Sequence, residues 1–376
     1  MKILISGGHL TPALSFIDFV QKNHQDEVVF VGRKYSQTDL QQKSVEREEV
    51  TKRNVKFIAF DSGKLILTDP MNLLHQLFKV FTSFFTALRI FSKEKPDLFL
   101  SFGGYLAVPL AVAARVKGVP IVTHEQTAAP GSANKFIAKF ANRVATSFPE
   151  TAAQFPVKKV VLTGNPIRQT IWTAKVVKPE WAEKPSQRPL LYITGGSQGS
   201  RAINSVIQKM LPQLLEEWDI IHQCGKANTL VNYVKELSES KAALPEELQS
   251  RYTIREQWIT EEELAWVYSQ AWAMISRAGA NTVQEVLRAQ IPTIFVPLAH
   301  THHDEQVKNA QSLALKSAAI VLLQNDLDES HLAACLNDLK KNHTSLKSHL
   351  KELSAQMPWN ADELLYGVVK DVAQVK

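Results

Sequence analysis

A carboxylate lies six residues beyond a glycine, in a segment whose pattern predicts a strand, a turn and a helix. The apolar run 271–275 predicts a buried strand, and Gly279 predicts a tight turn into the helix. The first backbone N–H groups of such a helix form an anion site. Glu285 lies almost two turns farther on, where a carboxylate can accept hydrogen bonds from a ribose diol. The alternative for Glu285 is an ordinary solvated helix glutamate.

Two glycine-rich segments each follow an apolar run and precede a helical pattern. Residues 6–13, SGGHLTPA, predict a loop at the carboxyl end of a strand that can hold a diphosphate, with His9 as a general base. A plain turn with a surface histidine is the alternative. Residues 194–204, TGGSQGSRAIN, add the hydroxyl of Ser197 to their backbone amides. Their spacing is neither G-x-G-x-x-G nor G-K-[ST], which weakens both a nicotinamide and a P-loop interpretation.

Polar side chains end another predicted strand in the first half. Residues 123–135, THEQTAAPGSANK, include His124, Glu125 and Gln126, and residues 101–109, SFGGYLAVP, supply a further glycine turn. Polar residues at the carboxyl ends of parallel strands usually serve a ligand, although hydrogen bonds between strands are the alternative. We therefore expect a ligand at this edge of the sheet.

The segment 297–310, PLAHTHHDEQVKNA, gathers histidines and acidic residues after a strand. These groups are nearly consecutive on one loop, so a polar rim for a sugar is favoured over a metal site. The acidic DLD at 326–328 precedes a helical pattern, which favours helix capping. No metal or other cofactor is therefore expected. The residues of the rim are His300, His302, His303, Asp304, Glu305 and Gln306.

Short apolar strands alternate with helical patterns, which indicates β-α-β units and parallel sheets. A link at 164–169 and a Pro-, Trp- and Lys-rich stretch to residue 189 divide the alternation into two similar halves. The fold class predicted is α/β, with two doubly wound Rossmann-like domains, 1–163 and 164–359, that face a central cleft. The predicted strands are 3–6, 28–32, 56–59, 98–101, 121–124 and 144–147, then 190–194, 220–223, 252–255, 273–276, 293–296 and 319–322.

The charge of the chain is uneven. Among 376 residues with a net charge of +6, residues 1–163 hold 21 Lys and Arg against 13 Asp and Glu, and the rest hold 22 against 24. The basic half predicts an anionic partner, and a membrane surface or a phosphorylated substrate is favoured over nucleic acid because no basic stripe with interleaved aromatics is present. Two cysteines without metal-ligand spacing and an N-terminus without an export signal favour a reducing cytoplasm. No segment has the length and apolarity of a transmembrane span.

One helical pattern, residues 72–93, has an unusually wide apolar face. Its Leu and Phe residues cover an arc of roughly 160°, wider than the ~100° that a core contact requires. Lys79, Arg89 and Lys93 lie on the other side. A well-buried domain helix is one interpretation, and a partly exposed face that dips into a bilayer surface is the other.

In their order along the chain, these motifs resemble those of the MurG-type family. Its members are peripheral membrane glycosyltransferases that move N-acetylglucosamine from UDP to the lipid-linked muramyl peptide of cell-wall synthesis. The resemblance implies a GT-B architecture, with a final helix near 360–375 that crosses back onto the first domain. It also implies a role in peptidoglycan synthesis, cell shape and cell division, at the cytoplasmic face of the cell membrane. The matching segments are GGHLTPA, FGGYLAVP, HEQ, GNPIR, GGSQGSR, AGANTVQE and DEQ with the following NA.

The resemblance implies partners and residue roles as well. The partners are UDP-N-acetylglucosamine, an undecaprenyl-diphosphate-linked muramyl peptide and an anionic membrane surface, with no nucleic acid. Backbone groups of Ile259 would bind uracil, Glu285 the ribose and Arg168 the diphosphate, while His9 and the first glycine loop belong to the acceptor side. The candidate substrate-binding residues are Ser6, Gly7, Gly8, Tyr105, Thr127, Arg168, Ser197, Gln198, Ile259, Gly279, Ala280, Asn281, Thr282, Glu285, Glu305 and Gln306.

Three positions depart from the family pattern. The first loop carries only Gly7 and Gly8 before its histidine, where the family has a longer glycine run. Thr127 replaces an asparagine, so an amide's reach to a sugar hydroxyl is lost. Glu305 stands where an uncharged or imidazole side chain is usual.

The implied reaction is attack by a sugar C4 hydroxyl on the anomeric carbon of the UDP sugar, with inversion. Helix N-termini and Arg168 would stabilise the departing UDP in place of a metal ion. The base is His9 or Glu125. The alternatives are a related transferase for another lipid, a UDP-sugar epimerase, and a non-catalytic nucleotide-sugar-binding scaffold.

Overall fold

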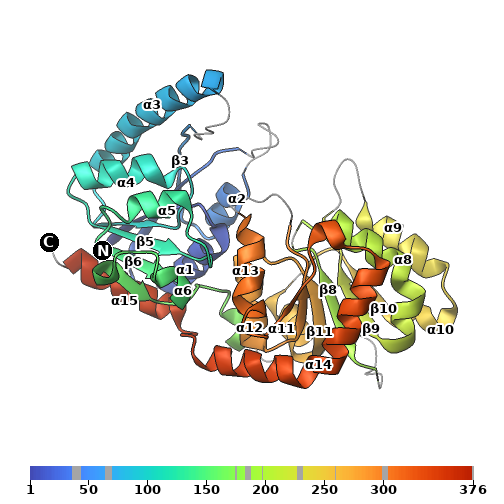
Figure 1. Cartoon of the computed structure of the whole chain (residues 1–376). Coiled ribbons are helices and arrows are strands. Elements are labelled where there is room, and N and C mark those ends of the chain that lie inside the picture. The colour runs from blue at the N-terminus through green and yellow to red at the C-terminus, as the bar shows by residue number, and fades with distance from the viewer. Residues whose placement is uncertain are drawn as a thin grey trace. The chain divides into compact units, whose positions relative to one another are not determined.

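The computed structural model describes residues 1–35, 44–63, 70–173, 176–182, 188–196, 198–226, 232–258, 260–298 and 304–374, and only the backbone of residues 70–78 and 170. Contacts divide the chain into two compact units: Met1–Arg168 together with Pro358–Lys376, and Gln169–Met357. Each unit is built around one sheet of parallel strands with helices on it (Figure 1). The prediction of two doubly wound α/β units is therefore confirmed.

The first unit holds seven strands in the order β3-β2-β1-β4-β5-β6-β7. The strand order reverses between β1 and β4, so the loops after these strands lie at the switch point where open α/β sheets bind ligands. The six predicted strands are confirmed with boundaries shifted by a residue at most, whereas the half-buried edge strand β7 was not predicted. The strands are β1 Lys2–Ser6, β2 Glu27–Gly32, β3 Lys56–Ala59, β4 Leu98–Ser101, β5 Ile121–Glu125, β6 Arg143–Thr146 and β7 Val160–Leu162.

Both faces of the first sheet are covered by helices, because successive strand residues point to opposite sides. Ile3 and Ile5 pack with side chains of α1 and α15, and Leu4 packs with side chains of α3 and α4. These two apolar layers form the core of the unit. Its helices are α1 Leu10–Asn23, α2 Val45–Lys52, α3 Pro70–Glu94, α4 Ala107–Val116, α5 Ser132–Ile137, α6 Pro149–Ala152 and α15 Ala361–Gln374, with a short 3-10 helix η1 Val157–Lys159.

The last helix, α15, belongs to the first unit although it follows the second unit in sequence. Leu365 and Val369 are buried in the same cluster as Phe16 of α1. Tyr366 stacks on His24 with ring centroids 3.7 Å apart, and its hydroxyl donates a 2.6 Å hydrogen bond to Asp26. The helix therefore completes one face of the first sheet.

The second unit holds six strands in the order β10-β9-β8-β11-β12-β13. The order reverses between β8 and β11, which makes the loops after those strands the switch point of this sheet. All six predicted strands are present, with boundaries within two residues of the prediction. The strands are β8 Leu190–Thr194, β9 Asp219–Gln223, β10 Tyr252–Arg255, β11 Ala271–Ser276, β12 Thr293–Phe295 and β13 Ile320–Val321.

The core of the second unit lies between its sheet and two long helices. Leu191, Ile193 and Ile275 pack against apolar side chains of α8 and α14. Among the residues that the structure describes, no helix of either unit is long and apolar enough to cross a membrane. The helices are α7 Thr170–Thr173, α8 Arg201–Glu217, α9 Tyr233–Ala242, α10 Glu246–Gln249, α11 Glu261–Gln270, α12 Ala280–Ala289, α13 Glu305–Ala314 and α14 Glu329–Ala355, with the 3-10 helix η3 Gln324–Asp326.

Candidate active site

The first glycine loop joins β1 to α1 and touches the glycine turn after β4. A Cβ atom placed on Gly8 would lie 2.3 Å from the carbonyl oxygen of Gly103 and 2.8 Å from the nitrogen of Gly104. Gly103 and Gly104 have φ angles of +76° and +78°, which side chains rarely tolerate. The two loops can approach this closely only because all three residues are glycines. Ser6 and Gly7 are buried beneath the contact, and Tyr105 follows it, half-buried.

His9 is the N-cap residue of α1 and is half-buried, with φ and ψ of −111° and 112°. It follows the Gly8 contact directly, so its backbone position is fixed by the packed glycines. The imidazole is thus a partly accessible group at the carboxyl edge of the first sheet, beside the first N–H groups of a helix. That setting suits a proton acceptor that works on a bound hydroxyl.

Glu125, the other candidate base, ends β5 and is only 1% exposed. Its carboxylate accepts hydrogen bonds from the backbone N–H groups of Thr127 and Gly131 at 3.1 and 2.9 Å, and from Nδ2 of Asn134 at 2.9 Å. The hydroxyl of Thr127 lies 2.6 Å from both Glu125 Oε1 and the carbonyl oxygen of Ala129. The lone pairs of this carboxylate are therefore used to fold the 126–134 loop. A substrate contact by the buried Thr127 stays a prediction.

Two further buried side chains organise this edge: His124, which the sequence placed here, and Asn134, which it did not mark. Asn134 of α5 donates to the carbonyl oxygen of His124 and accepts from the hydroxyl of Thr123 at 2.6 Å. His124 Nε2 lies 3.0 Å from the carbonyl oxygen of Gly164, to which it donates, and burial lowers the pKa of the imidazole to about 4. Both residues lie in the segment 123–135, and only the structure shows which groups they bind.

The second glycine loop joins β8 to α8 and packs against the end of β9. Gly196 and Gly199 have φ angles of +82° and +73°, and a Cβ on Gly199 would lie 2.0 Å from the carbonyl oxygen of Cys224. The N-cap hydroxyl of Ser200 accepts from the N–H of Ile203 at 3.3 Å, and Gln198 is exposed. Ser197 lies outside the described residues, as does Ile259, so their predicted roles stay predictions.

The stretch around Gly279 forms the predicted strand, turn and helix, but the reason given for the glycine is wrong. Gly279 has φ and ψ of −63° and 148°, an extended conformation open to any residue, and a Cβ there would meet only Thr282 Oγ1, at 3.9 Å. The turn therefore does not require glycine. What its missing side chain does is leave the N-terminus of α12 uncovered, at Ala280, Asn281 and the half-buried Thr282.

Glu285 is buried within α12, with an exposed fraction of 5%. The hydroxyl of Tyr268 donates to its Oε2 at 2.7 Å. The alternative of a solvated helix glutamate is therefore wrong. A buried carboxylate that a neighbouring hydroxyl holds in place is an oriented acceptor, and an oriented acceptor suits the binding of a diol.

The loop after β12 leads to α13, whose N-cap Asp304 has a φ of +53°. Oε1 of Gln306 accepts from the N–H of Leu298 at 3.0 Å, and Glu305 is half-buried beside it. His300, His302 and His303 lie outside the described residues, and the described part of the chain holds no cluster of three or more metal-ligating side chains. Capping of α14 is confirmed, because Asp328 accepts from the N–H of His331 at 2.8 Å.

Arg277 and Asn309 also support the second edge, and the sequence did not mark them. The guanidinium of Arg277 is buried and donates to the carbonyl oxygen of Val296 and to Gln324, and burial lowers its pKa. Asn309 donates to the carbonyl oxygen of Ala278 at 3.2 Å. Arg168, the last residue of the first unit, is half-buried.

Comparisons with known proteins give the same family for both units. Residues 6–146 match the glycosyltransferase family 28 N-terminal domain, and residues 190–363 match the glycosyltransferase family 28 C-terminal domain. The UDP-N-acetylglucosamine--N-acetylmuramyl-(pentapeptide) pyrophosphoryl-undecaprenol N-acetylglucosamine transferase of Clostridium perfringens (strain 13 / Type A) is 33% identical over 356 residues, 93% of each chain.

Solved structures extend the likeness. The crystal structure of Acinetobacter baumannii MurG is similar with a TM-score of 0.76 and 28% identity, over 98% of this chain and 99% of that chain. The S. aureus MnaA-UDP co-structure has a TM-score of 0.63 at 11% identity, over 97% and 94% of the two chains. The latter likeness concerns the fold alone.

Proposed function

The chain belongs to glycosyltransferase family 28, and on that basis we propose that it carries out the reaction for which its relatives are named. N-acetylglucosamine passes from UDP-N-acetylglucosamine to the C4 hydroxyl of N-acetylmuramyl-(pentapeptide) pyrophosphoryl-undecaprenol, the step that makes lipid II from lipid I in peptidoglycan synthesis. The observation that carries this proposal is the 33% identity over 93% of both chains to a transferase of that name. The enzyme is a UDP-sugar-dependent hexosyltransferase.

The second unit is the donor-binding unit in this proposal. The first backbone N–H groups of α8 and of α12 can donate hydrogen bonds to an anion, so they suit the diphosphate of the donor. Glu285, fixed by Tyr268, would accept the ribose hydroxyls, and Gln306 with Glu305 would contact the sugar. The guanidinium of Arg168 would add positive charge as UDP departs.

The first unit binds the acceptor, and His9 is the base. The C4 hydroxyl gives its proton to the imidazole of His9 as its oxygen bonds to the anomeric carbon. The bond from that carbon to UDP breaks, UDP leaves with the electron pair, and the configuration inverts. Glu125 is a poor alternative, because the carboxylate is buried and already accepts from Thr127, Gly131 and Asn134. Its role is to hold the loop.

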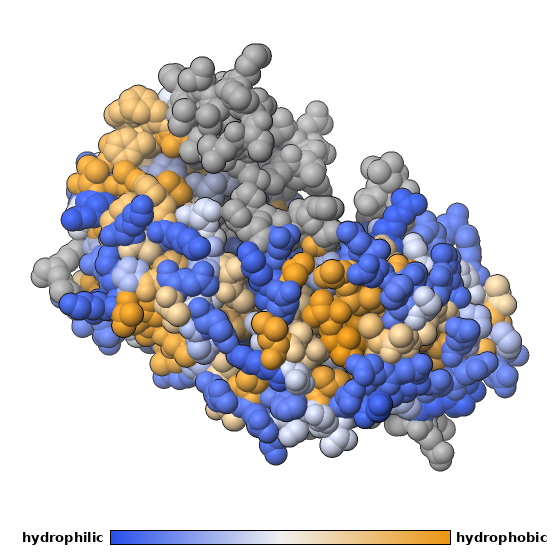
Figure 2. All heavy atoms as spheres, viewed as in Figure 1, coloured by the Kyte–Doolittle hydropathy of each residue, from blue (hydrophilic) through white to orange (hydrophobic). Residues whose placement is uncertain are grey.

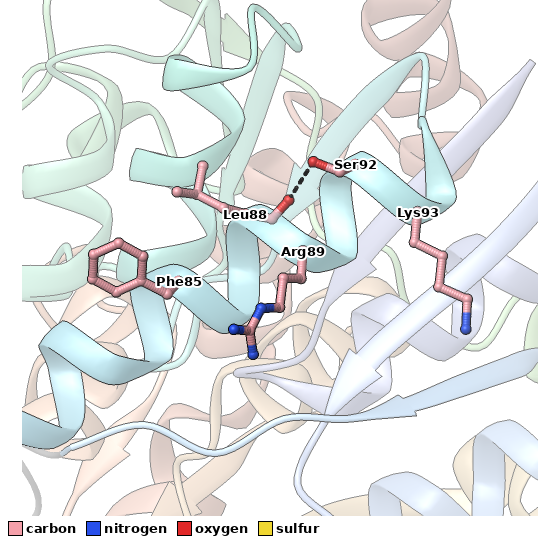
Figure 3. A pocket seen from close by; sticks show the side chains of 5 residues that line it. All are labelled: Phe85, Leu88, Arg89, Ser92 and Lys93. Atoms are coloured by element: carbon pink, nitrogen blue, oxygen red, sulfur yellow. Dashed lines mark hydrogen bonds between the residues drawn. The ribbon is translucent and has the colours of Figure 1, made fainter.

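Helix α3 is the proposed membrane contact of the first unit. Phe81 and Phe85 are 61% and 46% exposed, although they are large apolar side chains. Figure 2 shows hydrophobic surface gathered over the region of α3 and α4. A hollow of about 520 Å³ on α3 is lined by Phe85, Leu88, Arg89, Ser92 and Lys93, and Figure 3 shows Arg89 and Lys93 extending from the helix beside it.

The same helix has a second, buried face beside the exposed one. Phe91 is 2% exposed and packs edge-on against Phe99 with ring centroids 5.7 Å apart. Phe91 therefore belongs to the buried face, and the apolar arc is wide enough to serve both faces. Leu73, Leu77 and Phe78 lie where side chains are not described. A peripheral location at the cytoplasmic face of the membrane follows from the proposed lipid acceptor.

The test is transfer from labelled UDP-N-acetylglucosamine to a panel of lipid-linked acceptors. Labelled sugar should appear on the undecaprenyl-diphosphate muramyl peptide and not on unrelated lipids. His9→Ala should lose turnover and keep its affinity for UDP, which separates an enzyme from a non-catalytic binding protein. Label on a different lipid, or conversion of the UDP sugar to its 2-epimer without transfer, would refute the proposed reaction.

A further inference from the structure

A chain of three buried side chains crosses the second unit beneath the second glycine loop. His222 of β9 lies between Tyr252 of β10 and Asn204 of α8. The Tyr252 hydroxyl is 2.8 Å from His222 Nδ1, and Asn204 Oδ1 is 3.0 Å from His222 Nε2. All three residues are buried, and none has a part in the proposed reaction.

The hydrogen bonds leave only one arrangement of protons. Nδ2 of Asn204 donates to the carbonyl oxygen of Cys224 at 3.0 Å, so the amide oxygen of Asn204 faces the imidazole and can only accept. His222 Nε2 therefore carries the hydrogen, and Nδ1 accepts from the Tyr252 hydroxyl. Burial lowers the pKa of His222 to about 3 and raises that of Tyr252, so the chain stays neutral at working pH.

The end of this chain supports the glycine loop directly. The carbonyl oxygen of Cys224 that accepts from Asn204 is also the atom nearest to Gly199, where an added Cβ would lie 2.0 Å away. A Cβ on Gly225 would lie 2.1 Å from the nitrogen of Gly199. The backbone of the loop at Gly199 is thus in direct contact with the backbone at the end of β9. Asn204, in the first turn of α8, bridges them.

The Asn204 amide is held from both ends, by the carbonyl oxygen of Cys224 and by the Nε2–H of His222. If Asn204 turned its amide over, its oxygen would face the carbonyl oxygen of Cys224 and its NH₂ group would face the hydrogen on His222 Nε2. Both contacts would be repulsive, and the spacing between the β9 end and the loop would change. The Tyr252 hydroxyl pairs the Nδ1 atom of His222 and so holds the imidazole in place.

We propose that His222 is a positioning residue for the donor: acting through Asn204, it holds Gly199 and the first N–H groups of α8 where the donor diphosphate binds. This rests on the proposed function, in which the second unit binds the UDP sugar. The role concerns binding of the donor, so loss of the chain raises the KM for UDP-N-acetylglucosamine and the Kd for UDP. The rate at saturating donor and the KM for the acceptor stay close to those of the parent.

The variants that test this remove one contact at a time. His222→Leu removes both hydrogen bonds, whereas His222→Gln keeps an N–H donor for Asn204 and an acceptor for Tyr252. Tyr252→Phe removes only the hydroxyl that pairs Nδ1 of His222. Tyr233→Phe, another buried tyrosine of the same unit, and His343→Gln, on α14, are the matched controls.

Titration of UDP and steady-state kinetics with both substrates give the readout, beside the melting temperature of each variant. Tyr252→Phe should raise the Kd for UDP by about 3- to 10-fold, the equivalent of one hydrogen bond, and His222→Leu by more. His222→Gln should restore most of the parent's affinity, and the controls should leave it unchanged. A merely structural histidine would lower the melting temperature without this split between donor and acceptor.

The outcomes separate the two proposals. If the parent transfers sugar and binds UDP, but Tyr252→Phe and His222→Leu bind UDP as the parent does, the positioning role is refuted and the function stands. If His222→Leu does not fold, Tyr252→Phe alone decides. A parent that binds no UDP refutes the proposed function, and the positioning role with it.

Discussion

The Tyr268 hydroxyl donates a 2.7 Å hydrogen bond to Glu285 Oε2, and this joins helix α11 to helix α12. The Tyr268 ring stacks on Trp172 with centroids 5.8 Å apart, and the guanidinium of Arg288 covers Trp172 at 4.9 Å. The carboxylate therefore has its orientation set by the protein before a ligand arrives. An acceptor oriented in advance loses little entropy on binding.

We expect Glu285→Ala to weaken UDP binding by about 1 to 3 kcal/mol, because the ribose hydroxyls lose a charged acceptor. Glu285→Gln should lie between the parent and the alanine variant. Calorimetric titration of UDP measures both, and Glu262→Ala, at an exposed position of α11, is the control. An unchanged dissociation constant in Glu285→Ala would remove the ribose role.

His9 and Glu125 should fail in different ways. His9→Ala should lower kcat by about 10²- to 10⁴-fold, the usual contribution of a general base, with the melting temperature and the Kd for UDP unchanged. Glu125→Ala leaves the N–H groups of Thr127 and Gly131 without their acceptor, so it should lower the free energy of unfolding by about 1 to 3 kcal/mol for each group left unpaired. A stable Glu125→Ala protein with no turnover would assign the base to Glu125 instead.

Activity should not depend on a divalent metal, because in the proposed mechanism helix N-termini and Arg168 supply the positive charge for the leaving UDP. Transfer measured after dialysis against excess EDTA should equal that of the untreated enzyme. The contrary result, activity that returns only with magnesium or manganese, would point to His300, His302 and His303 as ligands.

The protein should co-sediment with anionic liposomes in a salt-sensitive manner, because each Lys or Arg near the surface contributes roughly 1 kcal/mol and exposed phenylalanines add an apolar term. Phe81→Asp, Phe85→Asp and Lys93→Glu should weaken sedimentation and leave UDP binding unchanged. Val157→Asp is the control, since Val157 is 87% exposed and lies off α3. Unaltered sedimentation of folded α3 variants would contradict the membrane role.

The free energy of unfolding should fall as the pH drops below about 6.5, because the buried His124 and His222 resist protonation in the folded protein. Their folded-state pKa values, about 4 and about 3, lie below the ordinary 6.5, so the unfolded chain binds more protons in this window. Their contribution is complete above pH 6.5 and declines by about 1.4 kcal/mol per pH unit for each histidine below it. Urea unfolding at pH 7.5 and 5.0 measures the loss.

In His222→Gln that loss should shrink by about 2 kcal/mol, because one of the two groups no longer titrates. The exposed His331 provides the control variant His331→Gln, which should keep the full pH dependence of the parent. If the parent and His222→Gln lost the same free energy of unfolding between pH 7.5 and pH 5.0, His222 would not resist protonation in the folded protein.

The repeating elements could be predicted because each leaves a local pattern. Strands β3, β4 and β10 have the predicted boundaries, since a short apolar run between polar residues is visible without any partner. Strand β7 was missed because it is half-buried at the edge of the sheet and lacks that contrast. Gly279 was assigned a backbone role that its φ of −63° does not require.

The contacts that organise the site could not be predicted, because they join residues far apart in sequence. Gly8 meets Gly103 across the switch point, and nothing near either residue identifies the other. The same holds for His222 and Asn204, which look like ordinary strand and helix residues until the fold brings them together. A wide apolar arc does not say which part of α3 is covered, so the sequence could not separate the buried Phe91 from the exposed Phe81 and Phe85.

The place of α15 has a consequence for how the protein is made. The helix buries Leu365 and Val369 against α1, yet a ribosome releases it only after the whole of Gln169–Met357. During synthesis the second unit can therefore fold first, while Phe16 and its neighbours still lack the helix that covers them. A chain interrupted after Met357 would carry a finished second unit together with an unfinished first sheet. The open apolar face of that sheet would make the chain a substrate for chaperones and proteases.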